Sequence, residues 1–486
     1  MRLSELLREV EFEGSIKNDF DIKFVTDDSR LVRPGALFVC IRHRSFDGHT
    51  AAAEALASGA AAVVTQERLG LENELNVADS RAAYARLCAA LCGHPERKLR
   101  MIGVTGTNGK TTVTTLIRNI LSDSGIKTLL TGTVCNRLGE ESLPSGLTTP
   151  KPPELYSLLS RAVLSGCEAC VAEASSQALA QGRLEGIAFD AAVFTNITRD
   201  HLDYHGTFEN YLAAKKKLFE HSEVSAVNLD DPRADEIIAA SSGKTVTFST
   251  VLDCADYTAK NISLLPEGVS FELVSKGRIE HINFASPGLF SVSNAMAAAV
   301  CAINLGVDPR SAAQSLARSK GVCGRLERVE CGTPYSVIID YAHTPDGLEQ
   351  VLRALRPSCR GKLIVLFGCG GDRDKTKRPL MGAAACKYAD TVIVTSDNPR
   401  SEEPMKIIGD ILKGTDKKRR SLFVEEDRRR ATALALSLAK PGDTVLLAGK
   451  GHEKYQLICG EKLPLDERET VREILGLPHD TGRKKP

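Results

Sequence analysis

Residues 101–115 constrain the fold more than any other stretch, because they join a buried strand to a helix through a glycine-rich turn. They read M-I-G-V-T-G-T-N-G-K-T-T-V-T-T, so an apolar run enters a turn of Gly, Thr and Asn, and a helix-compatible segment follows. Glycines let successive backbone N–H groups face an anion, and the helix N-terminus adds partial positive charge. The stretch therefore predicts a phosphate-binding loop.

The residues of this loop predict an ATP site with a metal ion. Lys110 is placed to reach the terminal phosphates, and the Thr111 hydroxyl is placed to bind Mg²⁺. The spacing departs from G-x-x-x-x-G-K-S/T, because Val104 stands where the first glycine belongs, and G-T-N-G-K-T-T is a tighter variant. A plain glycine turn beside a solvated lysine is the alternative, which the coincidence of strand, loop, Lys and Thr-Thr disfavours. The predicted ATP-binding residues of the loop are Gly106, Thr107, Asn108, Gly109, Lys110, Thr111 and Thr112.

Composition limits the class of protein. A chain of 486 residues is too long for one core, so two or three domains are expected. The net charge of +1, the aromatic content of 5% and the absence of Trp give no support for nucleic-acid binding. No apolar run reaches the roughly 18 residues of a membrane span, and the start lacks a signal peptide's apolar stretch. We expect a cytoplasmic monomer with small-molecule partners, whose 14 cysteines stay reduced.

The order of predicted elements indicates an α/β protein of three domains. Residues 1–97 read as a small α/β unit, and residues 98–322 alternate strand and helix, beginning with the phosphate loop. Such alternation predicts a central, mainly parallel sheet covered by helices. Residues 245–282 are more polar and resemble an antiparallel insertion. Residues 323–486 predict a C-terminal, Rossmann-like doubly wound domain.

Polar side chains follow two strands of the predicted central sheet. Glu173 ends one apolar run, and Asp200, His201 and Asp203 come after the next. Ligands of parallel sheets gather at the carboxyl ends of the strands. Because carboxylate and imidazole groups lie there beside a phosphate loop, the pattern predicts Mg²⁺ ligands.

The C-terminal domain repeats this arrangement. Each of its predicted strands delivers polar or glycine residues at its carboxyl end, and the resulting edge carries Arg378, Arg400 and Glu453. These strands are predicted at 336–340, 363–367, 391–396 and 443–448.

Seven motifs together resemble the Mur ligases of peptidoglycan synthesis. They are G-T-N-G-K-T-T, T-T-P, E-A-S-S, T-N-I-T-R-D-H-L-D, G-R-L-E-R, D-Y-A-H-T-P and G-K-G-H-E. Their order and spacing match the family from about residue 24 to 456. D-N-P-R with G-D-R-D-K-x-K-R-P-L-M-G resembles the members that add the third amino acid to UDP-N-acetylmuramoyl-L-alanyl-D-glutamate. Folylpolyglutamate synthases share the single motifs and remain an alternative.

The resemblance implies a role for each domain. The N-terminal domain takes the UDP end of the substrate, the central domain takes ATP, and the C-terminal domain takes the incoming amino acid. Asn294 and Arg325 are implied to contact ATP as well. The residues implied to bind the UDP substrate are Asp27, Ser29, Arg44, Ser45, Phe46, Thr148, Thr149, Ser175, Gln181 and Arg183.

The resemblance also implies the catalytic and metal groups. The lysine that matches Lys215 is carbamylated in the family, and a carbamate supplies the oxygen ligands that Mg²⁺ prefers. The substrate carboxylate attacks the γ-phosphate of ATP, and the amine of the amino acid then displaces phosphate from the acyl phosphate. The group that deprotonates the amine is not identified. The implied catalytic residues are Lys110, Glu173, His201 and Lys215, and the implied metal ligands are Thr111, Glu173, His201 and carbamylated Lys215.

The incoming amino acid is predicted to be meso-diaminopimelate. Arg378 and Arg400 can each pair with a carboxylate, and diaminopimelate carries a second carboxylate that lysine and ornithine lack. The same ligase acting on L-lysine or L-ornithine is the alternative. A switch GTPase is disfavoured because no Asn is followed by Lys, as N-K-x-D requires. The amino-acid site is predicted to comprise Arg378, Asp397, Asn398, Pro399, Arg400, Gly449 and Glu453.

Overall fold

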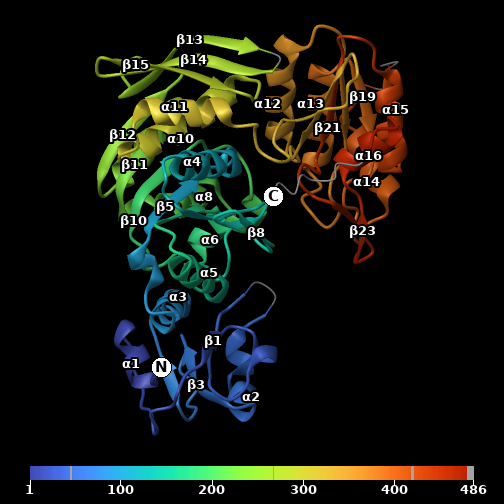
Figure 1. The fold of residues 1–486 in the computed structure, drawn as a ribbon. Coiled ribbons are helices and arrows are strands. Elements are labelled where there is room, and N and C mark those ends of the chain that lie inside the picture. The colour runs from blue at the N-terminus through green and yellow to red at the C-terminus, as the bar shows by residue number, and fades with distance from the viewer. Residues whose placement is uncertain (44–45, 266, 417–420, 479–486) are drawn as a thin grey trace. The chain divides into compact units, whose positions relative to one another are not determined.

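The structure is a computed structural model that describes residues 1–43, 46–265, 267–416 and 421–478. The chain forms two compact units, and the elements of each appear in Figure 1. The first unit comprises residues 1–197, 204–247 and 300–307, and the second comprises 198–203, 248–299 and 308–486.

The first unit begins with a small parallel sheet. Its strands are β1 (Phe24–Thr26), β2 (Ala36–Val39), β3 (Ala60–Thr65) and β4 (Glu74–Asn76), in the order β1-β2-β3-β4. Helices α1 (Leu3–Leu6), α2 (Ala52–Ala57) and α3 (Ser80–Leu91) accompany it. Helix α3 begins where the Asp79 carboxylate accepts hydrogen bonds from the N–H groups of Arg81 and Ala82.

A larger sheet carries the phosphate loop. Strands β5 (Arg100–Thr105), β6 (Thr128–Thr131), β9 (Ala169–Glu173), β10 (Phe189–Phe194) and β11 (Ser222–Asn228) lie parallel in the order β11-β10-β5-β9-β6. The short strands β7 (Asn136–Leu138) and β8 (Glu141–Leu143) add antiparallel at one edge. The chain leaves this unit within β12 (Lys244–Ser249). The prediction of a mainly parallel central sheet is confirmed.

Helices connect the strands of the larger sheet. They are α4 (Lys110–Asp123), α5 (Pro152–Leu164), α6 (Ser176–Ala180), α8 (Phe208–Lys216) and α9 (Ala234–Ala240), with α7 (Leu202–His205) at the boundary between units. Helix α4 buries Val113, Leu116, Ile117 and Ile120, the spacing of a helix with one apolar face.

The second unit contains the predicted antiparallel insertion. Strands β13 (Tyr257–Leu265), β14 (Gly268–Ser275) and β15 (Arg278–Phe284) pair antiparallel, as expected for residues 245–282. Two helices follow in the chain, α10 (Leu289–Asn304) and α11 (Pro309–Arg318).

A six-stranded sheet completes the second unit. Strands β16 (Glu327–Val329), β17 (Ser336–Asp340), β18 (Leu363–Phe367), β19 (Thr391–Val394), β20 (Leu422–Val424) and β21 (Thr444–Ala448) follow the order β16-β17-β21-β18-β19-β20. All neighbours are parallel except β16 and β17. A hairpin of β22 (Tyr455–Ile458) and β23 (Glu461–Pro464) follows.

Helices cover both faces of this sheet. Leu363, Val365 and Phe367 of β18 pack in one core with α12 (Pro345–Leu355), α13 (Lys377–Tyr388) and α14 (Pro404–Leu412). Ile364 and Leu366 pack in a second core with α15 (Arg428–Leu438) and α16 (Glu467–Ile474). Strands buried on both faces define the doubly wound fold predicted for the C-terminal domain, and Figure 1 shows the strands between α12–α13 and α15.

Among the residues that the structure describes, no helix is both long and apolar enough to cross a bilayer.

Candidate active site

The phosphate loop turns directly from β5 into α4. Gly109 lies at the N-terminus of α4 with a φ of 88°, a left-handed conformation that favours glycine. The Nζ of Lys110 donates to the carbonyl oxygens of Gly106 and Thr107, at 2.8 and 2.9 Å. The lysine therefore lies over the loop whose N–H groups are predicted to face phosphate.

The two residues after β10 hold the loop in shape. The Thr195 hydroxyl donates to the carbonyl of Asn108 at 2.6 Å, and the Asn196 carbonyl accepts the Thr107 N–H at 2.8 Å. A Cβ on Gly106 would lie 1.9 Å from Oγ1 of Thr195, so only glycine fits. Sequence reasoning missed these supporting roles, although both residues open the T-N-I-T-R-D-H-L-D motif.

Glu173 lies at the carboxyl end of β9, next to the loop. Its side chain is 1% exposed, and its Oε2 accepts hydrogen bonds from Oγ1 of Thr111 at 3.1 Å and of Thr133 at 2.9 Å. Its Oε1 accepts the Thr133 N–H at 2.8 Å. A Cβ on Gly132 would lie 2.4 Å from Oε1, so the backbone there approaches as closely as glycine allows. Thr133 is a second supporting residue that sequence reasoning missed.

A carboxylate beside the Thr111 hydroxyl fits the predicted Mg²⁺ site. Both groups offer hard oxygen atoms within hydrogen-bond distance of each other, at the end of the phosphate loop. We therefore keep Thr111 and Glu173 as the residues that would hold the ion in the first unit.

A path of hydrogen bonds joins Glu173 to the predicted substrate residues. The Thr149 hydroxyl donates to the carbonyl of Glu173 at 2.6 Å and accepts the Ser175 N–H at 3.1 Å. Arg183 Nη1 donates to the carbonyl of Thr149 at 2.7 Å, and its Nη2 donates to Oε1 of Gln181 at 2.7 Å. The structure thus brings four of the predicted substrate residues together next to Glu173.

Thr148 joins the same group through its neighbour. Its hydroxyl accepts a hydrogen bond from Oγ1 of Thr133 at 3.0 Å, and that same oxygen contacts Glu173. Both threonines of the T-T-P motif therefore lie near Glu173: Thr148 is linked to its carboxylate through Thr133, and Thr149 donates to its main-chain carbonyl.

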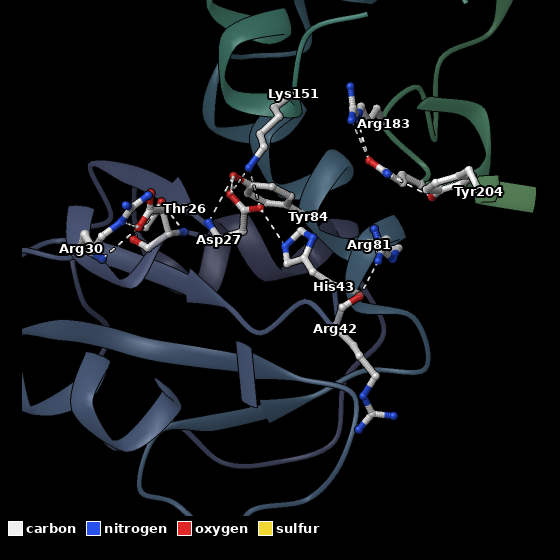
Figure 2. Close-up of polar contacts among 12 residues, drawn as sticks. Thr26, Asp27, Arg30, Arg42, His43, Arg81, Tyr84, Lys151, Arg183 and Tyr204 are labelled. Carbon is white, nitrogen blue, oxygen red and sulfur yellow. Dashed lines mark hydrogen bonds and ion pairs between the residues drawn. The ribbon is translucent and has the colours of Figure 1, made fainter. Parts of the chain in front are cut away.

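A pocket at the end of this path is shown in Figure 2. Asp27 lies in it with its side chain 8% exposed, and its carboxylate accepts from the Tyr84 hydroxyl at 3.1 Å and from Lys151 Nζ at 3.0 Å. We call it the Asp27 pocket. Its lining residues are Asp27, Ile41, His43, Arg81, Tyr84, Lys151, Pro152, Gln181 and Arg183.

The charges of the Asp27 pocket favour an anionic ligand. Three cationic side chains, those of Arg81, Lys151 and Arg183, line the pocket together with one carboxylate, that of Asp27. Burial lowers the pKa of the Arg183 guanidinium, and it also lowers the pKa of His43, whose Nε2 lies 3.5 Å from Asp27. An anion in the pocket would offset the excess of positive charge, as a nucleotide diphosphate does.

The remaining predicted residues of the UDP end lie outside this lining. Ser29 begins a short 3-10 helix (Ser29–Leu31), and Phe46 is 48% exposed. Arg44 and Ser45 lie outside the described residues. For these four residues the role in substrate binding stays a prediction.

The two other predicted metal residues belong to different units. Lys215 lies in the first unit, 1% exposed, with its Nζ 4.6 Å from the centroid of the Tyr211 ring. The Tyr211 hydroxyl lies 2.9 Å from Oγ1 of Thr107, which ties α8 to the phosphate loop. His201 belongs to the second unit, where it has a left-handed φ of 52° and lies 3.4 Å from the Asp200 carboxylate.

Two predicted ATP contacts, Asn294 and Arg325, lie outside the loop and belong to the second unit. Helix α10 is divided between the units, and residue 294 lies in the part that belongs to the second. Asn294 is buried in that helix. The Arg325 guanidinium lies over the Tyr341 ring, 4.8 Å from its centroid. For both residues the contact with ATP stays a prediction.

The D-N-P-R and G-K-G-H-E motifs meet at the carboxyl edge of the six-stranded sheet. Asp397 is buried, and its Oδ2 has no hydrogen-bond partner within the described part of the chain. A Cβ on Gly449 would lie 2.5 Å from that oxygen. Asn398 Nδ2 donates to Oε2 of Glu453 at 2.9 Å. An unpaired, buried carboxylate oxygen is costly, so an ammonium group of a ligand suits this place.

Arg400, three residues after Asp397, has a strained backbone conformation. Its φ is 54°, in the left-handed region that non-glycine residues rarely adopt. Its N–H donates to the Leu457 carbonyl at 2.9 Å, and its carbonyl accepts the Cys459 N–H at 2.7 Å. The guanidinium donates to the carbonyl of Gly371 at 2.7 Å. Hairpin β22–β23 therefore fixes the backbone of Arg400, which is predicted to bind the second carboxylate of diaminopimelate.

Arg378 lies in a different setting from the one its predicted role suggests. Its side chain is 1% exposed, and its guanidinium pairs with both oxygens of Glu402 at 2.8 and 3.1 Å. It also pairs with Asp410 at 3.0 Å. With two carboxylates already bound, the guanidinium is better suited to hold the surrounding loops than to bind an amino acid.

The comparisons with known proteins agree with the motifs. The Mur ligase middle domain matches residues 104–302, the glutamate ligase domain of Mur ligases matches 324–451, and the catalytic domain of the Mur ligase family matches 21–89.

Two named relatives and one solved structure span nearly the whole chain. UDP-N-acetylmuramoyl-L-alanyl-D-glutamate–2,6-diaminopimelate ligase of Syntrophomonas wolfei is 43% identical over 98% of this chain and 99% of its own. The enzyme of the same name from Caldanaerobacter subterraneus is 44% identical with the same coverage. A solved structure of a ligase of that name is 34% identical, covers 98% of this chain and 99% of its own, and has a TM-score of 0.72. The chain therefore belongs to the Mur ligase family, as its seven motifs predict.

Proposed function

We propose that the chain is an ATP-dependent amide ligase that joins meso-diaminopimelate to UDP-N-acetylmuramoyl-L-alanyl-D-glutamate in peptidoglycan precursor synthesis. The names of the full-length relatives support the reaction. The observation that carries the proposal is the path of hydrogen bonds from Arg183 through Thr149 to Glu173 and Thr111. This path connects a cationic pocket for an anionic substrate with the phosphate loop, as a ligase that activates a carboxylate with ATP requires.

ATP would bind at residues 106–112, with Asn294 and Arg325 as further contacts. The N–H groups at the start of α4 and the charge of Lys110 would offset the charge of the transferring phosphoryl group. Lys110 now bonds to the carbonyls of Gly106 and Thr107, and it would exchange these acceptors for phosphate oxygens.

The metal site of the proposal consists of Thr111, Glu173, His201 and carbamylated Lys215. When bound there, Mg²⁺ supplies positive charge next to the phosphate oxygens. The buried position of Glu173 and its hydrogen bond with Thr111 support the first part of this site. For Lys215, the support is its burial near the phosphate loop, through Tyr211 and Thr107.

The reaction balances as two substitutions. The free carboxylate of the UDP substrate attacks the γ-phosphorus of ATP, so that an acyl phosphate forms and ADP leaves. The amine of the amino acid then attacks the acyl carbon and forms the C–N bond. The acyl C–O bond breaks, phosphate leaves with its electron pair, and the nitrogen gives up a proton. The protein contributes mainly position and electrostatics to both steps.

The ends of the two substrates would occupy separate sites. The Asp27 pocket with Thr148, Thr149 and Ser175 would hold the UDP substrate. Arg400, Asp397 and Glu453 would hold the distal amino-acid end of diaminopimelate, with Asn398, Pro399, Gly449 and Arg378 as further members of the site. ATP and a UDP-linked sugar are metabolites of the cytoplasm, where we propose that the chain acts as a monomer.

The choice of amino acid tests the proposal. We expect product from UDP-N-acetylmuramoyl-L-alanyl-D-glutamate and ATP with meso-diaminopimelate, and about 100-fold less with L-lysine or L-ornithine, because neither offers Arg400 a carboxylate. Arg400→Ala should abolish most of this preference, as measured by chromatography of the UDP products. A preference for lysine or ornithine would keep the ligase and overturn the role of Arg400.

A further inference from the structure

Lys450, in the G-K-G-H-E motif, has no exposed side-chain surface. Its Nζ donates to Oδ1 of Asn398 and to Oε2 of Glu453, both at 2.8 Å, and lies 5.5 Å from the centroid of the Tyr455 ring. Taking an ammonium out of water costs several kcal/mol unless it is well paired. The two hydrogen-bond partners therefore offset the cost of burying this lysine at the carboxyl edge of the sheet.

The partners of Lys450 also bind each other. Asn398 Nδ2 donates to Oε2 of Glu453 at 2.9 Å, and Asn398 Oδ1 accepts the Leu457 N–H at 2.9 Å. Lys450, Asn398 and Glu453 thus form a closed triangle of hydrogen bonds, which we call the Lys450 triangle. It joins the loop after β19 to the loop after β21, two strands that β18 separates in the sheet.

The Lys450 triangle uses only one side of the Glu453 carboxylate. Within the described residues, the hydrogen bonds to its side chain fall on Oε2, which leaves Oε1 as an acceptor for a ligand. Lys450 also balances the charge of Glu453, and the buried Asp397 beside Gly449 is a further negative charge at this edge. An amino group with its own positive charge matches that arrangement.

We propose that Lys450 is a positioning residue of the amino-acid site. It does not touch the amino acid, and it holds Glu453 and Asn398 in the geometry that binds the distal ammonium of diaminopimelate. The inference rests on the proposed function. It adds Lys450 as a residue that contributes to amino-acid selection through Glu453 and Asn398.

The test is a double-mutant cycle with Lys450→Met, Glu453→Gln and the double variant. Lys450→Met should raise the KM for meso-diaminopimelate about 10-fold or more, because a hydrogen bond between charged groups is lost. The KM for ATP and for the UDP substrate should stay within about 2-fold. Because Lys450 acts through Glu453, the double variant should be little worse than Glu453→Gln alone.

Lys462→Met is the matched control, since Lys462 is exposed and lies over the same Tyr455 ring at 4.6 Å. It should leave all three KM values unchanged. If Lys450→Met does not fold, as judged by its melting curve, Lys450→Gln replaces it in the cycle.

The outcomes separate the inference from the proposed function. If the effects of Lys450→Met and Glu453→Gln on KM multiply in the double variant, or if all three KM values rise equally, Lys450 is not a positioning residue. Either result would leave the proposed ligase activity unaffected. A wild-type protein without activity on any amino acid would overturn the proposed function itself.

Discussion

Glu173 is a buried carboxylate at a strand end, and threonines from two different elements bind both of its oxygens. Thr111 comes from the start of α4, and Thr133 follows β6. Such partners fix the direction in which a carboxylate presents its remaining lone pairs. The predicted role of Glu173 in catalysis can therefore be tested separately from the role of Thr133 in orienting it.

We predict that Glu173→Gln lowers kcat about 100-fold or more, since the amide keeps the volume of the side chain and removes its charge. Thr133→Val should lower kcat about 10-fold, because Glu173 stays charged and loses its orientation. Steady-state kinetics with saturating substrates measure both effects. Thr115→Val is the control, because its hydroxyl bonds only to the Thr111 carbonyl among the contacts described and does not reach the carboxylate. Near-normal kcat in folded Glu173→Gln would contradict the account.

The sequence identified Lys110 by the glycine-rich loop around it, and Glu173 by its place at the end of an apolar run. Thr133, Thr195 and Asn196 were not identified, because their partners lie far along the chain and only the folded sheet brings them together. Thr195 and Asn196 could have been found from their place as the first two residues of the T-N-I-T-R-D-H-L-D motif. Thr133 carried no signal of its own.

At the scale of elements, Arg378 ties two helices and a loop together. It lies in α13, Asp410 lies in α14, and Glu402 lies in the segment before α14. The sequence suggested a carboxylate-binding arginine, and the structure places two carboxylates of the chain itself on the guanidinium. Those partners are 24 and 32 residues away, beyond the reach of a local pattern.

We predict that Arg378→Met lowers the free energy of unfolding by roughly 2–4 kcal/mol, because it leaves two carboxylates without their buried partner. Urea denaturation measures the change. Lys413→Met is the control: Lys413 pairs with the same Asp410 but is 72% exposed, so about 0.5 kcal/mol or less is expected. A variant of Arg378 with normal stability and a raised KM for the amino acid would instead show that Arg378 binds substrate.

The Arg378–Glu402 pair should also make stability depend on pH. Arg378 lowers the pKa of the Glu402 carboxyl from 4.5 to about 2 in the folded state. Because the unfolded chain takes up this proton at higher pH, the stabilisation is complete above about pH 4.5 and is lost as the pH falls toward 2. Denaturation of the wild type and of Glu402→Gln should therefore differ most near neutral pH and converge across this window. A difference that stays constant with pH would contradict the pairing.

Sequence patterns predicted the long strands better than the short ones. Strands at 336–340 and 363–367 were predicted with the bounds that the structure shows, because both are continuous apolar runs. The three-residue strands β7, β8 and β16 carry no such run, and pairing with a neighbour alone makes them strands.

For the whole molecule, alternating strands and helices predicted an α/β protein with a central parallel sheet and a doubly wound C-terminal domain, and the structure and the family matches confirm this fold. The boundaries after residues 97 and 322 stay predictions, since the chain groups into two compact units that exchange segments along the sequence. Sequence order alone cannot reveal such exchanges, because they depend on which strands become neighbours.

Cleavage of ATP by this ligase should be coupled to amide formation. Phosphate release from ATP by the full chain, with each substrate alone and with both together, tests this coupling directly. We expect release only when UDP-N-acetylmuramoyl-L-alanyl-D-glutamate and meso-diaminopimelate are both present, with one phosphate for each UDP-muramoyl tripeptide formed. Phosphate release that needs neither substrate, or that proceeds without the tripeptide, would contradict it.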